Sequence, residues 1–296
     1  MTSQFAGSPN DSQAVAAASG GDKPFGSTLS AIARKPFLKW AGGKTQLIAE
    51  LSKYIPSRFN TYIEPFMGGG ALFFHMAPEK AVIADLNEEL VVTYRCVKER
   101  PDEVIKLLKT YRNEEDFYYR VRALKPAALS EVERAARLIY LNKTCFNGLY
   151  RVNKNGEFNV PYGKRTSDFL QESTLRNAGR FLKGTTILHS DYKQTVAAHA
   201  KKGDFVFLDP PYYPVGKNAD FKRYTKEFFY HDDQVALKAE FDALVARGCH
   251  VLLTNSDHPV VLELYSEYRI EIVETKRLIS SNPNTRTGKD IIVIGG

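Results

Sequence analysis

Short apolar runs of strand length recur along the chain, and each stops at polar or turn-forming residues. The stretches between them repeat apolar side chains every three or four positions, as helices packed on a sheet do. The runs that predict strands are 61–64, 80–84, 185–188, 205–208, 250–254, 268–273 and 291–294. This alternation predicts an α/β fold with an open sheet. The last two runs leave no room for a helix between them and predict an antiparallel pair joined by the loop 277–289.

Helical periodicity and capping residues predict the segments between the strands. Helices are expected over 44–51, from Ala71 onward, over 88–112, and over 231–247 with Asp232 and Asp233 in its first turn. Ser130 and Glu133 have the spacing of a capping box and predict a helix that runs to about Asn142. Residues 1–34 are rich in Ser, Ala and Gly with few large apolar side chains, and we expect them to be disordered.

The first strand is followed at once by the glycine-rich segment PFMGGG, residues 65–70, and then by a helix. Strand, glycine turn and helix form the first half of a nucleotide-binding βαβ unit. The spacing is Phe-x-Gly-x-Gly, which does not specify a pyrophosphate cradle. Asp85 ends the second strand about 20 residues after Glu64, where an acid can bind both hydroxyls of a ribose. The pattern predicts a cofactor that contains adenosine and lacks a diphosphate.

The tetrad Asp209-Pro210-Pro211-Tyr212 follows the apolar run 205–208, so it lies at the carboxyl end of a strand. Open α/β sheets bind their ligands there. The Asp209 carboxylate and the Pro210 carbonyl can each accept a hydrogen bond from an amino group, and Tyr212 offers a flat face for a planar ring. The set suits a heteroaromatic amine, although Asp-Pro-Pro also occurs in ordinary strand-to-turn exits.

A Gly-Gly turn flanked by Trp40 and Lys44 opens the ordered part of the chain. It is not a phosphate loop, because that motif needs Gly where Leu38 stands. Such a turn lets the backbone approach a ligand closely, with an indole and an ammonium on either side. The alternative is a plain surface turn before a helix.

Residues 96–185 hold 18 Lys and Arg against 11 Asp and Glu, a surplus equal to the net charge of +7 of the whole chain. Within this basic segment, Asn155-Gly156 lies between two alternating runs and predicts a β-hairpin over 146–163. Four aromatic residues are interleaved with its cations, and we expect a nucleic-acid-binding hairpin whose aromatic tips enter a groove and wedge or stack on bases. The aromatic residues are Phe146, Tyr150, Phe158 and Tyr162. The alternatives are a solvated basic face and an ordinary half-buried hairpin.

Three distant cysteines and six histidines without an H-x-x-x-H pair argue against a disulfide framework and a metal site. No apolar run approaches the ~20 residues of a membrane span. We therefore expect a protein of the reducing cytoplasm that needs no metal.

Taken in order, the motifs LKWAGGK, EPFMGGG, the Asp of IAD, CFNGLYRVN with GEFNVPYG, and DPPY resemble those of the Dam family of DNA adenine methyltransferases. The resemblance covers nearly all of residues 35–296, and it implies a monomer that acts at the bacterial nucleoid. It implies a Rossmann-like, S-adenosylmethionine-dependent catalytic domain over 35–95 and 186–296, with a target-recognition insert over 96–185. Two departures are the SSNPNTR stretch, where the family more often has SSNxGTR, and Tyr150, where some relatives have smaller residues.

The resemblance also assigns roles residue by residue. For catalysis it implies Asp209, Pro210 and Tyr212. For S-adenosylmethionine it implies Trp40, Lys44, Glu64, Phe66, Gly68, Gly70, Asp85, Asp191 and Asp209. For double-stranded DNA it implies Lys39, Phe146, Asn147, Leu149, Arg151, Pro161 and Lys164, with Phe146 filling the gap left by a flipped adenine and Lys39, Leu149 and Arg151 reading GATC.

Two rival functions remain open at this stage. A methyltransferase of RNA or of a protein amide would more often have Asn at the position of Asp209 and would lack the basic hairpin. A DNA-binding protein without activity is disfavoured because the cofactor and amine motifs are intact. The sequence also leaves open whether the enzyme acts alone or beside a restriction endonuclease.

Overall fold

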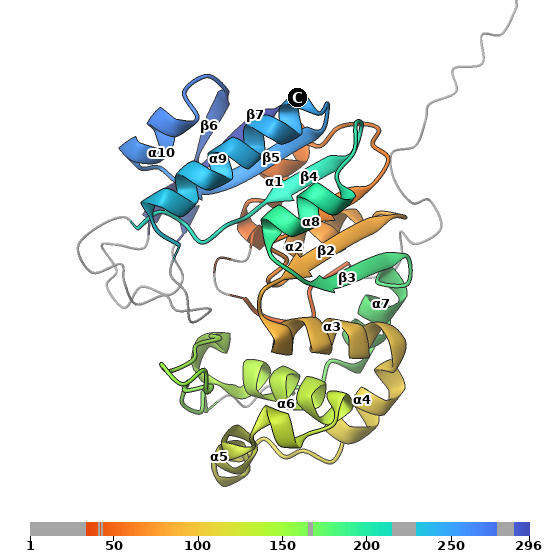
Figure 1. The fold of residues 1–296 in the computed structure, drawn as a ribbon. Coiled ribbons are helices and arrows are strands. Elements are labelled where there is room, and N and C mark those ends of the chain that lie inside the picture. The colour runs from red at the N-terminus through yellow and green to blue at the C-terminus, as the bar shows by residue number, and fades with distance from the viewer. Residues whose placement is uncertain (1–33, 41, 43, 165–167, 215–228, 277–286) are drawn as a thin grey trace, which may run out of the picture.

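The computed structural model describes residues 34–40, 42, 44–164, 168–214, 229–276 and 287–296. A twisted sheet forms the upper half of the molecule and a group of helices forms the lower half (Figure 1). Two expectations lie wholly or mainly outside the described residues: the tail 1–34 and the SSNPNTR stretch from Ser280 to Arg286.

The sheet has seven strands in the order β3-β2-β1-β4-β5-β7-β6. Strands β1 to β5 run parallel, and β7 lies antiparallel between β5 and β6. The strands are β1 Tyr62–Glu64, β2 Ala81–Asp85, β3 Thr185–His189, β4 Phe205–Leu208, β5 His250–Ser256, β6 Arg269–Lys276 and β7 Thr287–Gly295. This order matches the doubly wound arrangement over its first five strands and confirms the predicted Rossmann-like α/β class. The β6–β7 pairing is also confirmed, although β7 begins inside the expected loop.

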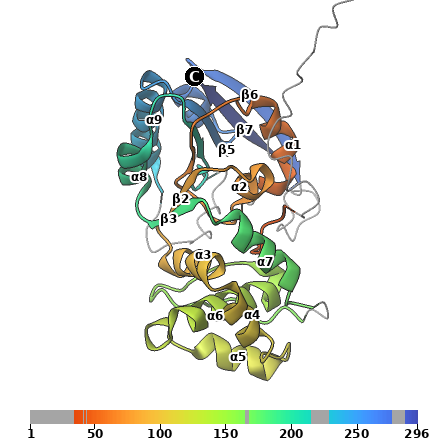
Figure 2. The ribbon, with the colours of Figure 1, turned by 90° about the vertical axis from the view of Figure 1, so that its right-hand side faces the viewer.

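Successive residues of each central strand belong to different cores. Tyr62, Phe205 and Phe207 pack on one face of the sheet, whereas Ile63 and Val206 pack on the other. This alternation is what a strand buried on both faces requires. The helices α1 Ile48–Leu51 and α2 Ala71–Met76 cover one face, and α8 Tyr192–His199 and α9 His231–Ala246 cover the other (Figure 2). A short helix, α10 Pro259–Leu264, precedes β6.

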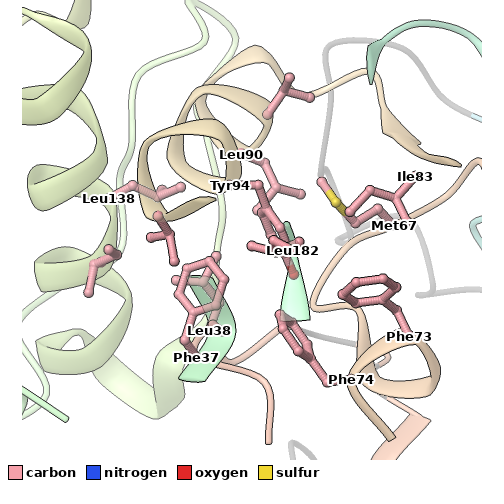
Figure 3. Packing of buried hydrophobic residues seen from close by; sticks show 14 of the residues in the cluster. Phe37, Leu38, Met67, Phe73, Phe74, Ile83, Leu90, Tyr94, Leu138 and Leu182 are labelled. Carbon is pink, nitrogen blue, oxygen red and sulfur yellow. The ribbon is translucent and has the colours of Figure 1, made fainter. Parts of the chain in front are cut away.

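The helical half is joined to the sheet by a shared core. Leu138 of the helical half belongs to the same cluster as Leu90 and Tyr94, and Tyr94 stacks on Phe74 of α2 with ring centroids 6.2 Å apart (Figure 3). The helices of this half are α3 Glu88–Glu99, α4 Pro101–Leu108, α5 Glu115–Ala123, α6 Glu131–Thr144 and α7 Glu172–Phe181. Helix α3 crosses the expected domain boundary between residues 95 and 96. The insert therefore begins within a helix that also packs on the sheet.

The helix expected over 88–112 is in fact two helices. Arg100 adopts φ −133° and ψ 47°, and Pro101 begins α4. Proline lacks an N–H and its ring clashes with the preceding turn, which ends α3. The capping box is confirmed, because the Ser130 N–H donates to Glu133 Oε2 at 2.8 Å and the Glu133 N–H donates to Ser130 Oγ at 3.4 Å.

The predicted hairpin forms with a short and irregular ladder. Its only bridges among the described residues join Val152 to Phe158 and Cys145 to Tyr162. Gly156, with φ 78°, closes the turn by donating its N–H to the Asn153 carbonyl at 3.0 Å. No helix in the described part of the chain is long and apolar enough to cross a membrane.

Candidate active site and DNA interface

Three carboxylates gather where neighbouring parallel strands end. Glu64 is the last residue of β1, Asp85 the last of β2, and Asp209 follows directly after β4. Because β1 lies between β2 and β4, the three acids meet at one edge of the sheet. The sequence predicted this edge as the site, and the strand order brings its residues together.

The glycine-rich loop after β1 is held by Asp85. The Gly68 N–H donates to Asp85 Oδ2 at 3.0 Å, and the Asn87 N–H donates to Oδ1 at 2.8 Å. Burial raises the pKa of Asp85, and these two backbone donors offset part of the rise. Gly68 and Gly70 have φ of 46° and 62°, which L side chains rarely adopt. The acid that we expected to bind a ribose therefore also shapes the loop beside it.

Packing supplies a second reason for glycine in this loop. A Cβ at Gly68 would lie 2.8 Å from Trp40 Cδ1, and a Cβ at Gly70 would lie 3.1 Å from the Tyr94 hydroxyl. We expected these glycines to make room for a cofactor. In the structure they make room for Trp40 and Tyr94.

Aromatic rings border the carboxyl ends of β1 and β3. Phe66 stacks on Tyr192 with ring centroids 5.0 Å apart and an interplanar angle of 28°. Asp191 caps α8 by accepting the Lys193 N–H at 2.8 Å. Leu86, which follows Asp85, is 49% exposed and adds apolar surface here. The sequence analysis did not single it out, and its position directly after the acid that ends a strand was the only available signal. Acids and flat apolar surface thus occur together, as an adenosine site needs.

Lys44 connects the backbone at Gly42 to the tetrad after β4. Its Nζ lies 2.6 Å from Asp209 Oδ1, and it also donates to the Gly42 carbonyl at 2.5 Å. The Thr254 hydroxyl donates to the same Asp209 Oδ1 at 2.7 Å. Burial raises the pKa of Asp209, while Lys44 and Thr254 lower it. We expected Lys44 to contact a cofactor, and here it holds the carboxylate expected to bind the amine.

Tyr212 and Glu64 flank this ion pair. Lys44 Nζ lies 4.6 Å from the centroid of the Tyr212 ring. Glu64 is 2% exposed and accepts a hydrogen bond from the Tyr62 hydroxyl at 2.9 Å. Burial raises the pKa of Glu64 well above its usual value, which favours the neutral acid. Glu64 therefore lies beneath the site surface.

A buried polar network that the sequence reasoning missed positions the tetrad. Gln234 of α9 donates to the Pro211 carbonyl at 3.1 Å and accepts from Asn255 at 2.9 Å. The Asn255 side chain in turn accepts the Tyr213 N–H at 3.0 Å. Gln234 and Asn255 are both fully buried. The run Thr254-Asn255-Ser256 at the end of an apolar strand is the signal that could have revealed this support, since buried polar residues need partners.

The hairpin presents one aromatic side chain to solvent, not four. Phe146 is 52% exposed, whereas Tyr150 and Phe158 are each 8% exposed. Tyr162 is half-buried, packs on Tyr118 and donates its hydroxyl to the Asn113 carbonyl at 3.0 Å. The expectation of several aromatic tips is wrong for Tyr150, Phe158 and Tyr162, because Tyr150 and Phe158 pack on each other, Tyr150 also stacks on Trp40, and Tyr162 packs on Tyr118. Phe146 remains available as a wedge.

The other residues expected to contact DNA lie around Phe146. Phe146 donates its N–H to the Pro161 carbonyl at 2.9 Å, and Pro161 is exposed. Asn147 and Lys164 are exposed and have positive φ values of 56° and 50°. Arg151 is exposed and donates Nε–H to Asn159 Oδ1 at 2.8 Å, which holds its guanidinium in place.

Lys39 and Leu149 complete this surface. Lys39 is exposed and Leu149 half-buried, and Lys39 comes from the chain segment before the Gly-Gly turn. No group of three or more His, Cys, Asp or Glu side chains suited to a metal ion occurs among the described residues.

Comparison with known proteins agrees with this arrangement. Residues 40–279 match the D12 class N6 adenine-specific DNA methyltransferase family. The chain is 39% identical over 261 residues to the type II methyltransferase M1.LlaDCHI of Lactococcus lactis subsp. cremoris, across 85% of this chain and 92% of that protein. It is 39% identical over 275 residues to M.MjaIII of Methanocaldococcus jannaschii, across 85% and 95%. It is 33% identical over 272 residues to the DNA adenine methylase of Haemophilus influenzae, across 90% and 95%.

The Rossmann-like sheet with acids at its strand ends, together with the family match, makes this chain a methyltransferase. The protein belongs to the D12 class of N6 adenine-specific DNA methyltransferases. It is an adenine-specific DNA methyltransferase, as the sequence predicted.

Proposed function

We propose that this enzyme transfers a methyl group from S-adenosylmethionine to N6 of the central adenine in double-stranded GATC, after flipping that adenine out of the helix. The observation that carries the proposal is the position of Asp209. It lies at the carboxyl end of β4, beside the glycine loop and Tyr212. The predicted roles of the residues around it are part of the same proposal.

The residues at the strand ends fit S-adenosylmethionine as the methyl donor. Asp85 suits the ribose hydroxyls, and Asp191 with the Phe66–Tyr192 stack suits the adenine. Lys44 pairs with Asp209 and Trp40 packs on the glycine loop, and these two residues would hold the methionine end. The absence of a pyrophosphate-type glycine motif agrees with a cofactor without a diphosphate. When bound, S-adenosylmethionine supplies a methyl group on a positively charged sulfur.

Asp209 and Pro210 would activate the adenine amine. Its lone pair is delocalised into the ring, so the nitrogen must become pyramidal before it can attack. Two acceptors that bind both amine hydrogens favour this change, and preorganised polar groups of this kind supply much of an enzyme's rate enhancement. Lys44 and Thr254 both contact Oδ1 of Asp209, so Oδ2 takes part in neither contact and can accept from the amine.

Tyr212 would stack on the flipped adenine, and Phe146 would fill the space that the base leaves. Extruding a base from a duplex costs a few kcal/mol, which contacts to the distorted DNA must offset. Phe146 is the exposed aromatic residue of the hairpin, and insertion of an apolar wedge between base steps is an established way to stabilise a distorted duplex. We place GATC recognition on Lys39, Leu149 and Arg151.

The proposal is tested with purified protein, tritiated S-adenosylmethionine and short duplexes. We expect methylation of GATC, loss of methylation when the adenine already carries an N6-methyl group, and at least about tenfold less product on duplexes with one altered base pair. Equal labelling of GATC and its variants would reject the site, and preferential labelling of single-stranded RNA would reject the substrate. With 2-aminopurine in place of the target adenine, Phe146→Ala should reduce the fluorescence rise that reports base flipping.

A further inference from the structure

Trp40 is the only tryptophan of the chain, and it lies between two elements with different proposed partners. On one side its indole packs on the glycine loop, so closely that a Cβ at Gly68 would lie 2.8 Å from Cδ1. On the other side it stacks on Tyr150 of the hairpin, with ring centroids 4.9 Å apart and an interplanar angle of 22°. One side chain therefore touches both the proposed cofactor loop and the recognition hairpin.

Tyr150 lies between two residues proposed to read DNA. Leu149 is half-buried, Tyr150 is 8% exposed and Arg151 is exposed. Because neighbouring side chains in extended backbone point to opposite sides, Tyr150 points inward where Arg151 points outward. Phe158 packs against the Tyr150 ring with centroids 5.7 Å apart and limits its movement. A shift of Leu149 or Arg151 on DNA would be passed through the backbone to the ring that touches Trp40.

A second contact fixes the same two segments beside each other. The Asn142 side chain accepts the Lys39 N–H at 2.8 Å and donates to the Lys39 carbonyl at 2.6 Å. It also donates to the Gly148 carbonyl at 3.4 Å, and a Cβ at Gly148 would lie 2.6 Å from Lys39 Cδ. Asn142 is fully buried. The backbone before Trp40 is thus tied to the start of the hairpin, so the Trp40–Tyr150 stack is held in register.

We propose that Tyr150 is a positioning residue that couples DNA binding to cofactor binding through its stack on Trp40. The inference rests on the proposed function, because it takes the glycine loop as the cofactor site and the hairpin as the DNA site. DNA orders the hairpin on one side of Trp40, and the cofactor orders the glycine loop on the other side. When one ligand has already ordered the protein, binding of the other costs less conformational entropy. The two ligands therefore strengthen each other's binding, and the effect is equal in both directions because binding free energies are reciprocal.

The test measures the dissociation constant of sinefungin, an S-adenosylmethionine analogue without a transferable methyl group, with and without a saturating GATC duplex. For the wild-type protein we expect DNA to tighten sinefungin binding at least about 5-fold, the lower end of typical coupling factors. In Tyr150→Leu this factor should fall to about one, while each ligand still binds alone. Tyr150→Phe keeps the stacked ring and should restore the wild-type factor.

Tyr162→Leu is the matched control. Tyr162 belongs to the same hairpin, but its ring packs on Tyr118, away from Trp40. The Tyr162→Leu variant should therefore keep the coupling factor even if it lowers the melting temperature. A wild-type factor that survives in Tyr150→Leu, or that is lost equally in Tyr162→Leu, would overturn the inference and leave the proposed function intact. Absence of sinefungin binding to the wild type would instead reject the proposed function.

The single tryptophan gives an independent measurement on the wild-type protein. Without any cofactor, the GATC duplex should shift or quench the emission of Trp40, since the ring that stacks on it belongs to the DNA-contacting hairpin. Should Tyr150→Leu fail to fold, this measurement decides: a change in emission supports the coupling, and an unchanged emission at saturating DNA overturns it.

Discussion

Lys44 and Asp209 form an ion pair with Nζ and Oδ1 2.6 Å apart, and their side chains are only 6% and 19% exposed. The pair connects the turn after Trp40 with the tetrad after β4, which are about 165 residues apart in sequence. Removing one partner of a buried ion pair leaves the other as an uncompensated charge. A mutation of Lys44 should therefore change the ionisation of Asp209, and a mutation of Asp209 should leave the Lys44 ammonium without its counter-ion.

Asp209→Ala should lower the rate of methyl transfer at least about a hundredfold. Loss of one preorganised acceptor raises a barrier by about 3 kcal/mol, roughly a hundredfold in rate. Single-turnover methylation of GATC at saturating S-adenosylmethionine measures this loss. Asp209→Asn is the control, because it keeps the shape and one acceptor oxygen and should retain more activity than Asp209→Ala. Near-wild-type turnover in Asp209→Ala would contradict the assigned role.

Lys44→Met should shift the pH profile of methylation. The carboxylate of Asp209 is the form that accepts from the amine, so activity falls as the pH drops through the pKa of Asp209. Lys44 lowers that pKa. Its loss should therefore move the acid side of the profile to higher pH, which single-turnover rates from pH 5 to 9 would reveal. Lys53→Met, at an exposed position in the following helical turn, should leave the profile unchanged. A profile that stays in place in Lys44→Met would show that Lys44 does not control the ionisation of Asp209.

Glu64→Gln should raise the stability of the protein at neutral pH and change it little at pH 4. Burial raises the pKa of Glu64, so the folded state keeps a proton that the unfolded state loses above about pH 4.5. The unfolded state then binds fewer protons than the folded state, and stability falls as the pH rises through this range. Glutamine keeps the acceptor for the Tyr62 hydroxyl and removes the titration. Thermal melts from pH 4 to 8 should show the melting temperature of the variant rising relative to that of the wild type as the pH increases. A difference in melting temperature that does not change with pH would contradict the expectation.

Arg151→Ala and Lys164→Ala should separate base reading from phosphate binding. The Arg151 fork, held by Asn159, can bond two acceptors on guanine, so its loss should cost about 1–3 kcal/mol and relax discrimination at one base pair. Lys164 is an exposed point charge, and its loss should weaken binding to all sequences alike and lower the salt dependence. Methylation of GATC and each single-base variant, at several salt concentrations, compares the two. Equal losses on every sequence for Arg151→Ala would make Arg151 a backbone contact.

The sheet was largely predictable from the sequence because its strands are short apolar runs with abrupt ends. The run 205–208 coincides with β4, and two prolines after Asp209 leave no alternative end point. The carboxyl-end acids followed from the same runs. Helix ends were harder to predict, because the apolar periodicity of 88–112 continues across Pro101 although one helix ends and another begins there.

What the sequence could not give was the choice of partner for each side chain. Lys44, in the short helical turn Lys44–Gln46, binds Asp209, which follows β4 far along the chain, and no local pattern records this contact. Basic and aromatic residues alternate in the hairpin, but burial of Tyr150 and Phe158 depends on Trp40 and on each other. Gln234 and Asn255 look like surface residues in the sequence, and only tertiary contact makes them a support for the tetrad.

The core that runs from α2 through α3 to α6 bears on how a new target sequence could be acquired (Figure 3). If the helical half were exchanged for that of a relative, the cluster that holds Leu90 and Tyr94 would lose Leu138, and the sheet would lose part of its own cover. Grafting a whole foreign insert should therefore yield poorly folded chimaeras. The exposed positions of the hairpin, such as Arg151 and Lys164, lie outside this core. We expect changes of specificity to arise by point substitution there, with the scaffold inherited intact.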